Sequence, residues 1–158
     1  MRALIQRVTR CAVTIAGSRR SEIGPGILIL LGIRNGDTVG DAEALAVRCS
    51  ALRIFEDAEG KMNRSLQDTG GSAMVVSQFT LYADTRRGNR PGFSDAAPPA
   101  AAEPLYETFL AALRTAIGPE RVGSGVFRAM MDIELVNAGP VTVMVESRAG
   151  DAGISGGK

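Results

Sequence analysis

The chain has 158 residues, 45% of them hydrophobic and 22% charged, which is typical of a single soluble globular domain. A formal net charge of +1 excludes a surface that is basic overall and binds nucleic acid through it, so any nucleic-acid contact must come from a local basic patch. The absence of histidine excludes a Ser-His-Asp triad, a Cys-His pair and metal sites built on imidazole. No run approaches the ~20 apolar residues of a membrane helix, and Cys11 and Cys49 are expected as free buried thiols, so a cytoplasmic protein without membrane contact is predicted.

Apolar patterns predict about seven strands and two helices. The clearest strands expected are residues 2–8, 11–16, 26–33, 72–84, 130–137 and 141–147. The first helix should begin at Thr38, with Asp41 in the capping-box position, and the second should run from Pro104 to Gly118. Each helix has a single apolar stripe, so both are expected to lie on one face of a mixed sheet, with further strands layered on the other. The predicted fold is one α/β domain over residues 1–147, followed by a Gly-rich, disordered tail at 148–158.

Polar residues interrupt the predicted central strand at Ser77, Gln78 and Thr80. A strand buried on both faces should not contain such side chains unless they have partners. The segment is either an edge strand with one wet face or a strand end that meets a ligand. Neither the carboxylates nor the Gly-rich GPGILILLG segment gives a recognisable acid–base pair or phosphate loop.

Two further segments stand out between the regular elements. Residues 85–102 form a long Pro-, Gly- and Ala-rich loop. It contains Arg86, Arg87 and Arg90, which either bind phosphates or are solvent-exposed charges without a binding role. The stretch LVNAGPVTV places Gly139-Pro140 between two apolar runs, where a turn is the usual interpretation.

In order, the segments ALIQRVTRCAVTI, IGPGILILLGI, RIFEDAEGKMN, VVSQFTLYADTRRGNRPGF, AEPLYETF and LVNAGPVTV resemble the D-aminoacyl-tRNA deacylase family from Met1 to about Ser147. The family's signatures SQFTL and N-x-G-P-x-T are intact at Ser77–Leu81 and Asn137–Thr142. Arg128 departs from the family, which tends to have a small residue there.

The resemblance implies a homodimeric, three-layered editing hydrolase with helices over two β-layers. Its substrate would be tRNA charged with a D-amino acid. A rigid wall would reject L-aminoacyl-tRNA sterically but could not reject hydrogen, so we also expect glycine on a tRNA such as tRNA-Ala to be a substrate. The resemblance also implies that the Gly139–Pro140 bond is cis and that this pair reaches into the partner's pocket. No cofactor or metal is implied.

Most of the site residues follow from the same resemblance, whereas the tRNA-binding arginines follow from their place together in the Gly- and Pro-rich loop. Catalysis is assigned to Ser77, Gln78, Phe79 and Thr80, chiral selectivity to Gly139 and Pro140, support of that loop to Arg7, Asn137 and Thr142, and tRNA binding to Arg86, Arg87 and Arg90. Backbone N–H groups near Phe79 and Thr80 are expected to hold the oxyanion. The terminal ribose 2′-hydroxyl, as the resemblance suggests, would activate water, and Thr80 as a direct nucleophile is the rival.

Two other classes stay open. A non-catalytic RNA-binding module would give salt-sensitive RNA binding without ester cleavage, although the near-neutral charge and the 4% aromatic content argue against it. In a structural dimer or small-ligand binder, the polar Ser77–Thr80 segment would only be a sheet edge.

Overall fold

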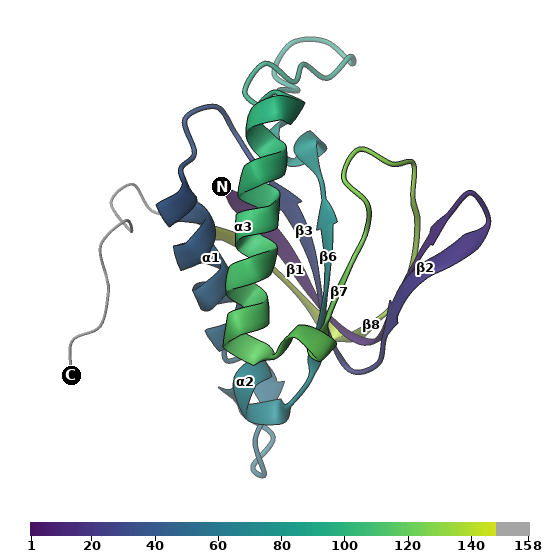
Figure 1. Cartoon of the computed structure of the whole chain (residues 1–158). Coiled ribbons are helices and arrows are strands. Elements are labelled where there is room, and N and C mark those ends of the chain that lie inside the picture. The colour runs from purple at the N-terminus through teal and green to yellow at the C-terminus, as the bar shows by residue number, and fades with distance from the viewer. Residues whose placement is uncertain (148–158) are drawn as a thin grey trace.

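The computed structural model describes residues 1–147, so the tail expected at 148–158 lies outside the described residues. Figure 1 shows two long helices lying across one face of a twisted sheet. The elements are, in chain order, β1 (Arg2–Ile15), β2 (Ser18–Ile23), β3 (Gly26–Gly32), α1 (Val39–Ala51), β4 (Phe55–Glu56), β5 (Met62–Arg64), α2 (Leu66–Thr69), β6 (Ser72–Ser77), the 3-10 turn η1 (Phe79–Tyr82), α3 (Pro99–Ile117), the 3-10 turn η2 (Pro119–Arg121), β7 (Val122–Ser124) and β8 (Asp132–Glu146).

Strand β1 organises the sheet because it pairs with three other strands. Residues 2–8 pair with β3, residues 11–15 pair with β2, and β8 runs antiparallel to β1 along residues 2–14. Strands β2 and β3 therefore share one edge of β1, and β8 occupies the other. Strands β6 and β7 continue from β3 in parallel, which makes this a mixed sheet of six strands.

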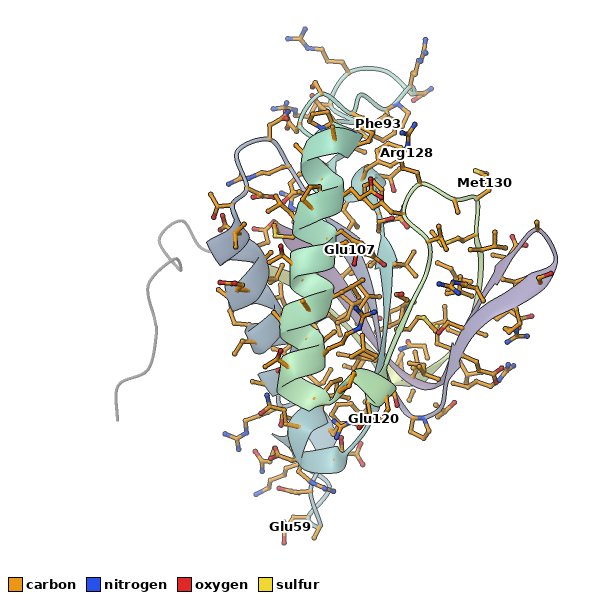
Figure 2. All side chains as sticks on the ribbon, viewed as in Figure 1. Glu59, Phe93, Glu107, Glu120, Arg128 and Met130 are labelled. Carbon is orange, nitrogen blue, oxygen red and sulfur yellow. The ribbon has the colours of Figure 1, made fainter. Side chains whose placement is uncertain are left out.

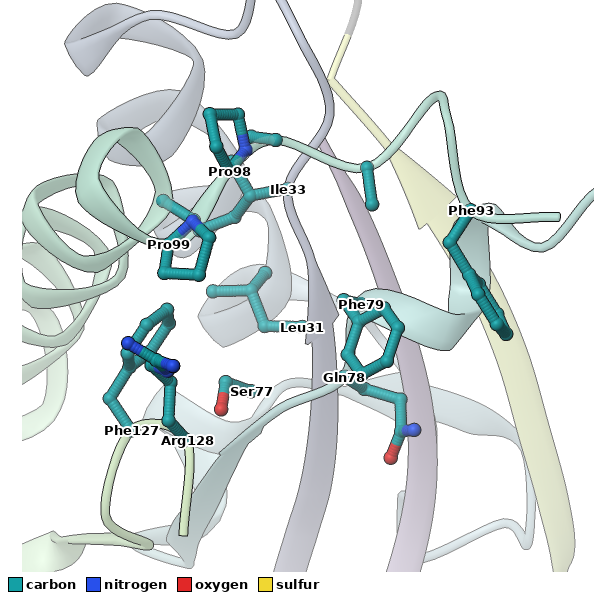
Figure 3. A pocket seen from close by; sticks show the side chains of 13 residues that line it. Leu31, Ile33, Ser77, Gln78, Phe79, Phe93, Pro98, Pro99, Phe127 and Arg128 are labelled. Carbon is teal, nitrogen blue, oxygen red and sulfur yellow. The ribbon is translucent and has the colours of Figure 1, made fainter.

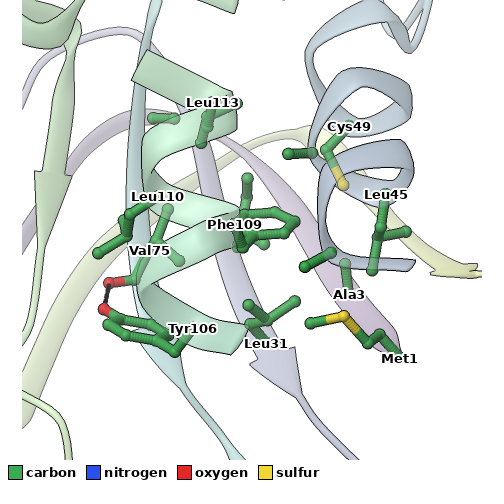
Figure 4. Packing of buried hydrophobic residues seen from close by; sticks show 14 of the residues in the cluster. Met1, Ala3, Leu31, Leu45, Cys49, Val75, Tyr106, Phe109, Leu110 and Leu113 are labelled. Atoms are coloured by element: carbon green, nitrogen blue, oxygen red, sulfur yellow. Dashed lines mark hydrogen bonds between the residues drawn. The ribbon is translucent and has the colours of Figure 1, made fainter. Parts of the chain in front are cut away.

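The two faces of β3 and β6 carry separate apolar cores. On one face, alternate residues such as Ile29 and Val75 pack against α1 and α3, and Figure 4 shows Leu45 and Phe109 in this cluster. The hydroxyl of Tyr106 in α3 donates to the Val75 carbonyl at 3.0 Å and anchors the helix to β6. The second core consists of Val8, Cys11, Val13, Ile23, Leu28, Met74 and Val76. It is enclosed where β2 and the far halves of β1 and β8 turn over the sheet.

The expected α/β domain with helices on one face of a mixed sheet is confirmed. The second β-layer is a continuation of the first sheet, because the long strands β1 and β8 belong to both, so the sheet curls toward a barrel. A homodimer is not described by a single chain and stays a prediction.

Helix α1 begins as the sequence predicts. Thr38 is its N-cap, the Thr38 hydroxyl accepts from the Asp41 amide at 3.2 Å, and the Asp41 carboxylate accepts from the Thr38 amide at 2.9 Å. Gly118 ends α3, also as predicted. None of the helices within residues 1–147 is long and apolar enough to span a membrane.

Three boundaries differ from the sequence prediction. The strand expected over residues 72–84 ends at Ser77, and the chain then turns through η1. Helix α3 begins at Pro99, because Pro is tolerated in a first turn whose N–H groups have no helical partner, and Pro104 lies inside it. The short strands expected on either side of residue 10 and of residue 139 are continuous, as β1 and β8.

We predict that Thr38→Ala lowers the free energy of unfolding by about 1 kcal/mol, because the capping box loses its side-chain acceptor. Urea denaturation at pH 7 measures the change. Thr115→Ala is the matched control: Thr115 is exposed within α3 and bonds only to the preceding turn, at Ala111, so its removal should be neutral or slightly stabilising. Equal losses in the two variants would contradict the capping role.

Candidate active site

A pocket of about 450 Å³ lies at the carboxyl ends of the parallel strands β3 and β6, beside the start of α3. Its size falls within the range of small-molecule sites. The lining residues are Leu31, Ile33, Ser77, Gln78, Phe79, Phe93, Ala96, Ala97, Pro98, Pro99, Ala102, Phe127 and Arg128 (Figure 3). Most of the wall is therefore apolar, with Ser77 and Gln78 as its uncharged polar groups.

The polar end of the pocket exists because the chain leaves the sheet at Gln78. The Gln78 amide donates to the Leu31 carbonyl at 2.8 Å, and its own carbonyl accepts from the Leu81 amide at 3.2 Å. This turn packs close to Gly32, where a Cβ atom would lie 3.1 Å from the Leu81 side chain and 3.2 Å from the Gln78 carbonyl oxygen. A residue with a side chain at position 32 would push the turn away from β3.

The turn leaves two backbone donors without partners. The first N–H groups of a helical turn have no acceptor within it. Among the described residues 1–147, the amides of Phe79 and Thr80 donate to no carbonyl or side chain. Phe79 lines the pocket and Thr80 follows it, so the two partnerless amides belong to the turn at this edge of the pocket.

The side chains around this turn are placed differently from one another. Ser77 and Gln78 line the pocket, whereas Thr80 is exposed and is not part of the wall. The Gln78 amide group donates to the Thr80 hydroxyl. Thr80 therefore has its hydroxyl engaged by a neutral partner, and no basic group of the described residues bonds to it.

Aromatic residues that sequence reasoning missed complete the wall. Phe93 comes from the long loop after η1, and its ring meets that of Phe79 edge-on with the centroids 5.0 Å apart. Phe127 comes from the loop between β7 and β8, and the centroid of its ring lies 5.7 Å from that of the Tyr106 ring. The only sequence signal for Phe93 was the unusual length of its loop. Figure 2 shows Phe93 and Arg128 near the same end of α3.

The segment with Gly139 and Pro140 is a bulge on β8. Gln6 pairs with Thr142 and Val8 pairs with Asn137, so one β1 residue faces the four residues 138–141. Arg7 is that residue. Its Nε donates to the Ala138 carbonyl at 3.2 Å, and its Nη1 donates to the Ile54 carbonyl at 2.7 Å.

Asn137 closes the base of this bulge. Its side-chain amide donates to the Arg7 carbonyl at 2.9 Å and to the Val141 carbonyl at 3.1 Å, while Thr142 accepts from Gln6 at 3.2 Å. No peptide bond in residues 1–147 is cis, so the cis Gly139–Pro140 bond that we expected is wrong for this structure. The bend is made instead by Gly139 at φ +115°, a conformation open to glycine, with the Pro140 bond in the intrinsically favoured trans form.

The structure does not bring the bulge to the pocket of its own chain. Arg7 pairs with Ile27 on β3, whereas the pocket begins at Leu31, about 13 Å farther along the strand at 3.3 Å per residue. None of residues 137–142 lines the pocket. The two sequence signatures are therefore separate features of one chain.

The three arginines of the loop after η1 differ in whether their side chains have bonding partners. The Arg86 side chain binds Asp84 through two hydrogen bonds of 2.8 Å, and these bonds hold the pKa of the Asp84 carboxyl well below its usual range. Arg87 and Arg90 are exposed and have no hydrogen-bond or ion-pair partner within the described part of the chain. The loop is closed by paired backbone bonds between Asp84 and Gly92 of 2.7 and 2.9 Å.

The cysteines offer no nucleophile at neutral pH. Burial raises the pKa of Cys11 to about 11 and that of Cys49 to about 12, so both thiols stay protonated. In residues 1–147, no three His, Cys, Asp or Glu side chains are grouped so as to hold a metal ion.

Comparison with known proteins decides the family. The profile of the family described as D-Tyr-tRNA(Tyr) deacylase matches residues 4–146. The chain belongs to this family. A protein of Thermomicrobium roseum named D-aminoacyl-tRNA deacylase is 56% identical over 93% of this chain and 94% of its own length. One of Roseiflexus castenholzii with the same name is 57% identical over 93% of this chain and 92% of its own length.

Two solved structures share the fold of this chain. A structure titled c-Myc DNA Unwinding Element Binding Protein superposes with a TM-score of 0.89 at 43% identity, covering 94% of this chain and all of that one. A structure titled as a probable eukaryotic D-amino acid tRNA deacylase gives a TM-score of 0.78 at 17% identity over 92% and 98%, which supports the fold alone.

We predict that Gly139→Ala lowers the free energy of unfolding by about 2–3 kcal/mol, since it combines a positive φ with loss of a charged hydrogen bond. The new Cβ would lie 2.4 Å from Nη2 of Arg7, so the guanidinium would have to move. Urea denaturation measures the change, with Gly17→Ala as the control: Gly17 has φ +77° and open space around its Cβ direction, so only the backbone cost of about 1 kcal/mol should appear. Equal losses would show that Arg7 moves freely.

Proposed function

We propose that this protein is an editing hydrolase that cleaves the ester of D-aminoacyl-tRNA, releasing the free D-amino acid and tRNA. The observation that carries the proposal is that a chain of the deacylase family, about 56% identical to relatives named D-aminoacyl-tRNA deacylase, places Ser77, Gln78 and Phe79 on the wall of a ligand-sized pocket. The two unpaired buried thiols fit the reducing cytoplasm, in which tRNA is charged.

Catalysis needs no charged base in this proposal. An aminoacyl ester is already activated, so the barrier to be lowered is modest. The partnerless amides of Phe79 and Thr80 are suited to hold the oxyanion that develops when water attacks the ester carbonyl. One such donor is typically worth ~10²–10³ in rate.

We assign activation of the water to the 2′-hydroxyl of the terminal ribose, which lies beside the ester on the substrate itself. The rival is attack by the Thr80 hydroxyl. A hydroxyl nucleophile needs an adjacent base, but the Thr80 hydroxyl is bonded to the Gln78 amide and stands outside the pocket wall. Both facts favour assistance by the RNA.

Chirality is read by exclusion in this mechanism. D- and L-aminoacyl groups have the same atoms, so discrimination depends on where the side chain points once the amino group and the ester are fixed. A rigid wall on the L side is sufficient. Backbone carbonyls around Gly139 and Pro140 would form such a wall, because a backbone group cannot move aside by changing rotamer. Such a wall cannot exclude hydrogen, so glycyl-tRNA, for example glycine mischarged on tRNA-Ala, is also a substrate.

The wall is supplied by a second copy of the chain. The bulge at 138–141 lies far from its own pocket, so it can act only on another subunit. Two features favour a homodimer. Strand β8 pairs only with β1 among the described residues, which leaves one edge open. Val136 and Met144 of this strand are 42% and 48% exposed, and Met130 beside it is 90% exposed.

Contacts to the body of the tRNA are assigned to the loop after η1. Arg87 and Arg90 are free to meet phosphates, whereas Arg86 is bound to Asp84 and shapes the loop instead. A second candidate function, an RNA-binding module without catalysis, would use these same arginines. The relatives named D-aminoacyl-tRNA deacylase favour the enzyme, because free backbone amides such as those of Phe79 and Thr80 can also bind RNA phosphates.

One tRNA charged separately with D-tyrosine, L-tyrosine and glycine tests the proposal directly. With EDTA present, we expect rapid loss of D-tyrosine and glycine, with L-tyrosine spared. Release of the radiolabelled amino acid gives the rates. If glycine and L-tyrosine resist equally, the steric wall is wrong; if all three survive while the protein is folded and binds tRNA, the binding module is the better account.

Thr80→Val separates the two catalytic hypotheses. Because the 2′-hydroxyl is proposed to do the chemistry, we expect a change in kcat of less than about tenfold, reflecting only the lost bond to Gln78. Thr115→Val, on the exposed face of α3 and about 20 Å along the helix from its pocket end, is the control. A Thr80→Val protein that folds and binds tRNA but has no turnover would establish Thr80 as the nucleophile.

A further inference from the structure

Arg128 is a charge in an otherwise uncharged pocket. Of the 13 residues that line the pocket, Arg128 alone carries a formal charge. In Figure 3, Ser77 lies between Arg128 on one side and Phe79 on the other. The guanidinium has no hydrogen-bond or ion-pair partner among residues 1–147, and its side chain is exposed at the rim. Its five donors are available to a ligand.

The backbone at Arg128 is unusual for this residue type. The Ala129 amide donates to the Val126 carbonyl at 3.1 Å, so residues 126–129 form a tight turn. Arg128 is the third residue of this turn and has φ +64°, while Phe127 has no positive φ. A turn with that pattern favours glycine or asparagine at its third position. An arginine here costs folding energy, and its side chain finds no partner within the described chain that offsets the cost.

The chemistry of the pocket wall limits which part of the substrate the Arg128 guanidinium can bind. The apolar and aromatic wall suits a nucleoside, and the donors near Phe79 suit the ester, so both neutral parts of the substrate are accounted for. The anion carried by every substrate of the proposed reaction is the phosphate on the 5′ carbon of the terminal ribose, on the other side of the sugar from the ester. Arginine matches phosphate oxygens with paired donors.

We propose that Arg128 is a substrate-binding residue that holds the 5′-phosphate of the terminal nucleotide of the tRNA. This inference rests on the proposed function, since it needs the ester at the Phe79 side of the pocket. Arg128 thereby fixes the terminal nucleoside from one side while the amides hold the ester from the other. The phosphate contact is the same for every amino acid, so it strengthens binding without affecting chiral selectivity.

Two small substrates isolate the contact: the 3′-ester of D-tyrosine with adenosine, and the same ester carrying a 5′-phosphate. For the wild-type protein, we expect kcat/KM to be about tenfold higher with the phosphate than without it. In Arg128→Gln and Arg128→Gly, this preference should fall to about one, mainly through KM. Arg128→Lys should retain part of it, because the charge remains without the paired donors.

Controls cover folding, charge and the reaction itself. Arg128→Gly relieves the positive φ and should raise Tm, so loss of the phosphate preference in this variant cannot be due to unfolding. Arg20→Gln, at an exposed site on β2, removes the same charge away from the pocket and should keep the preference. Titration calorimetry with AMP and adenosine alone tests the contact without catalysis: AMP should bind wild type about tenfold more tightly than adenosine, and Arg128→Gln should bind both equally.

The outcomes are distinct. An unchanged phosphate preference in Arg128→Gln overturns the inference. The inference is also overturned if Arg128→Gln still prefers the 5′-phosphorylated ester but no longer prefers D-aspartyl over D-asparaginyl esters as the wild type does. Arg128 would then face the amino-acid side chain. If wild type cleaves neither ester but cleaves D-tyrosyl-tRNA, the AMP and adenosine titrations decide whether Arg128 binds phosphate. If it cleaves neither the esters nor D-tyrosyl-tRNA, the proposed function fails, and the same titrations still decide the role of Arg128.

Discussion

The antiparallel pairing of β1 with β8 positions both halves of the proposed site. Before Arg7, β1 holds β3 in register, and the end of β3 forms one wall of the pocket. At Arg7 the register with β8 skips, and residues 138–141 are pushed outward. The Arg7 side chain then spans from the Ala138 carbonyl to the Ile54 carbonyl, so its guanidinium stiffens the loop together with the Asn137 side chain, which closes the base of the bulge. A protruding loop can serve as a wall only if it is held in this way.

The pocket that the described residues form is lined by no imidazole and no carboxylate. A site with a general base would need a titrating group close to the ester, and the described pocket has only amides, a serine hydroxyl and the rim charge of Arg128. Under the proposed mechanism, the oxyanion donors lie where β6 stops. Because the chain turns at Gln78 instead of continuing the sheet, the amides of Phe79 and Thr80 have no ladder partner. The same feature that ends the strand therefore creates the donors, and Gly32 makes the turn fit against β3.

Sequence reasoning succeeded where one residue type has one strong structural preference. The run GILILLGI predicted a buried strand, and Thr38 with Asp41 marked a helix start through side-chain bonds that span three residues. Sequence reasoning failed where tertiary contacts determine the local structure. The residues Phe79–Tyr82 have strand-like composition, yet packing against Gly32 turns them into a 3-10 turn. Phe93 and Phe127 could not be placed in the pocket, because their loops have no periodicity and only the fold brings them together. The Gly139–Pro140 isomer was likewise beyond the sequence, since both isomers are compatible with the same residues.

The separation of pocket and bulge within one chain links selectivity to assembly. Under the proposed mechanism, a lone subunit has the oxyanion donors, the apolar wall and Arg128, and so has what is needed to bind the end of a charged tRNA and cleave its ester. What it lacks is the barrier to L side chains, because its own bulge lies about 13 Å along the strand from its pocket. An unassembled subunit would then be a hazard to correctly charged tRNA. In the proposed homodimer, the open edge and exposed apolar residues of β8 would be covered, so the surface that supplies selectivity would also favour assembly.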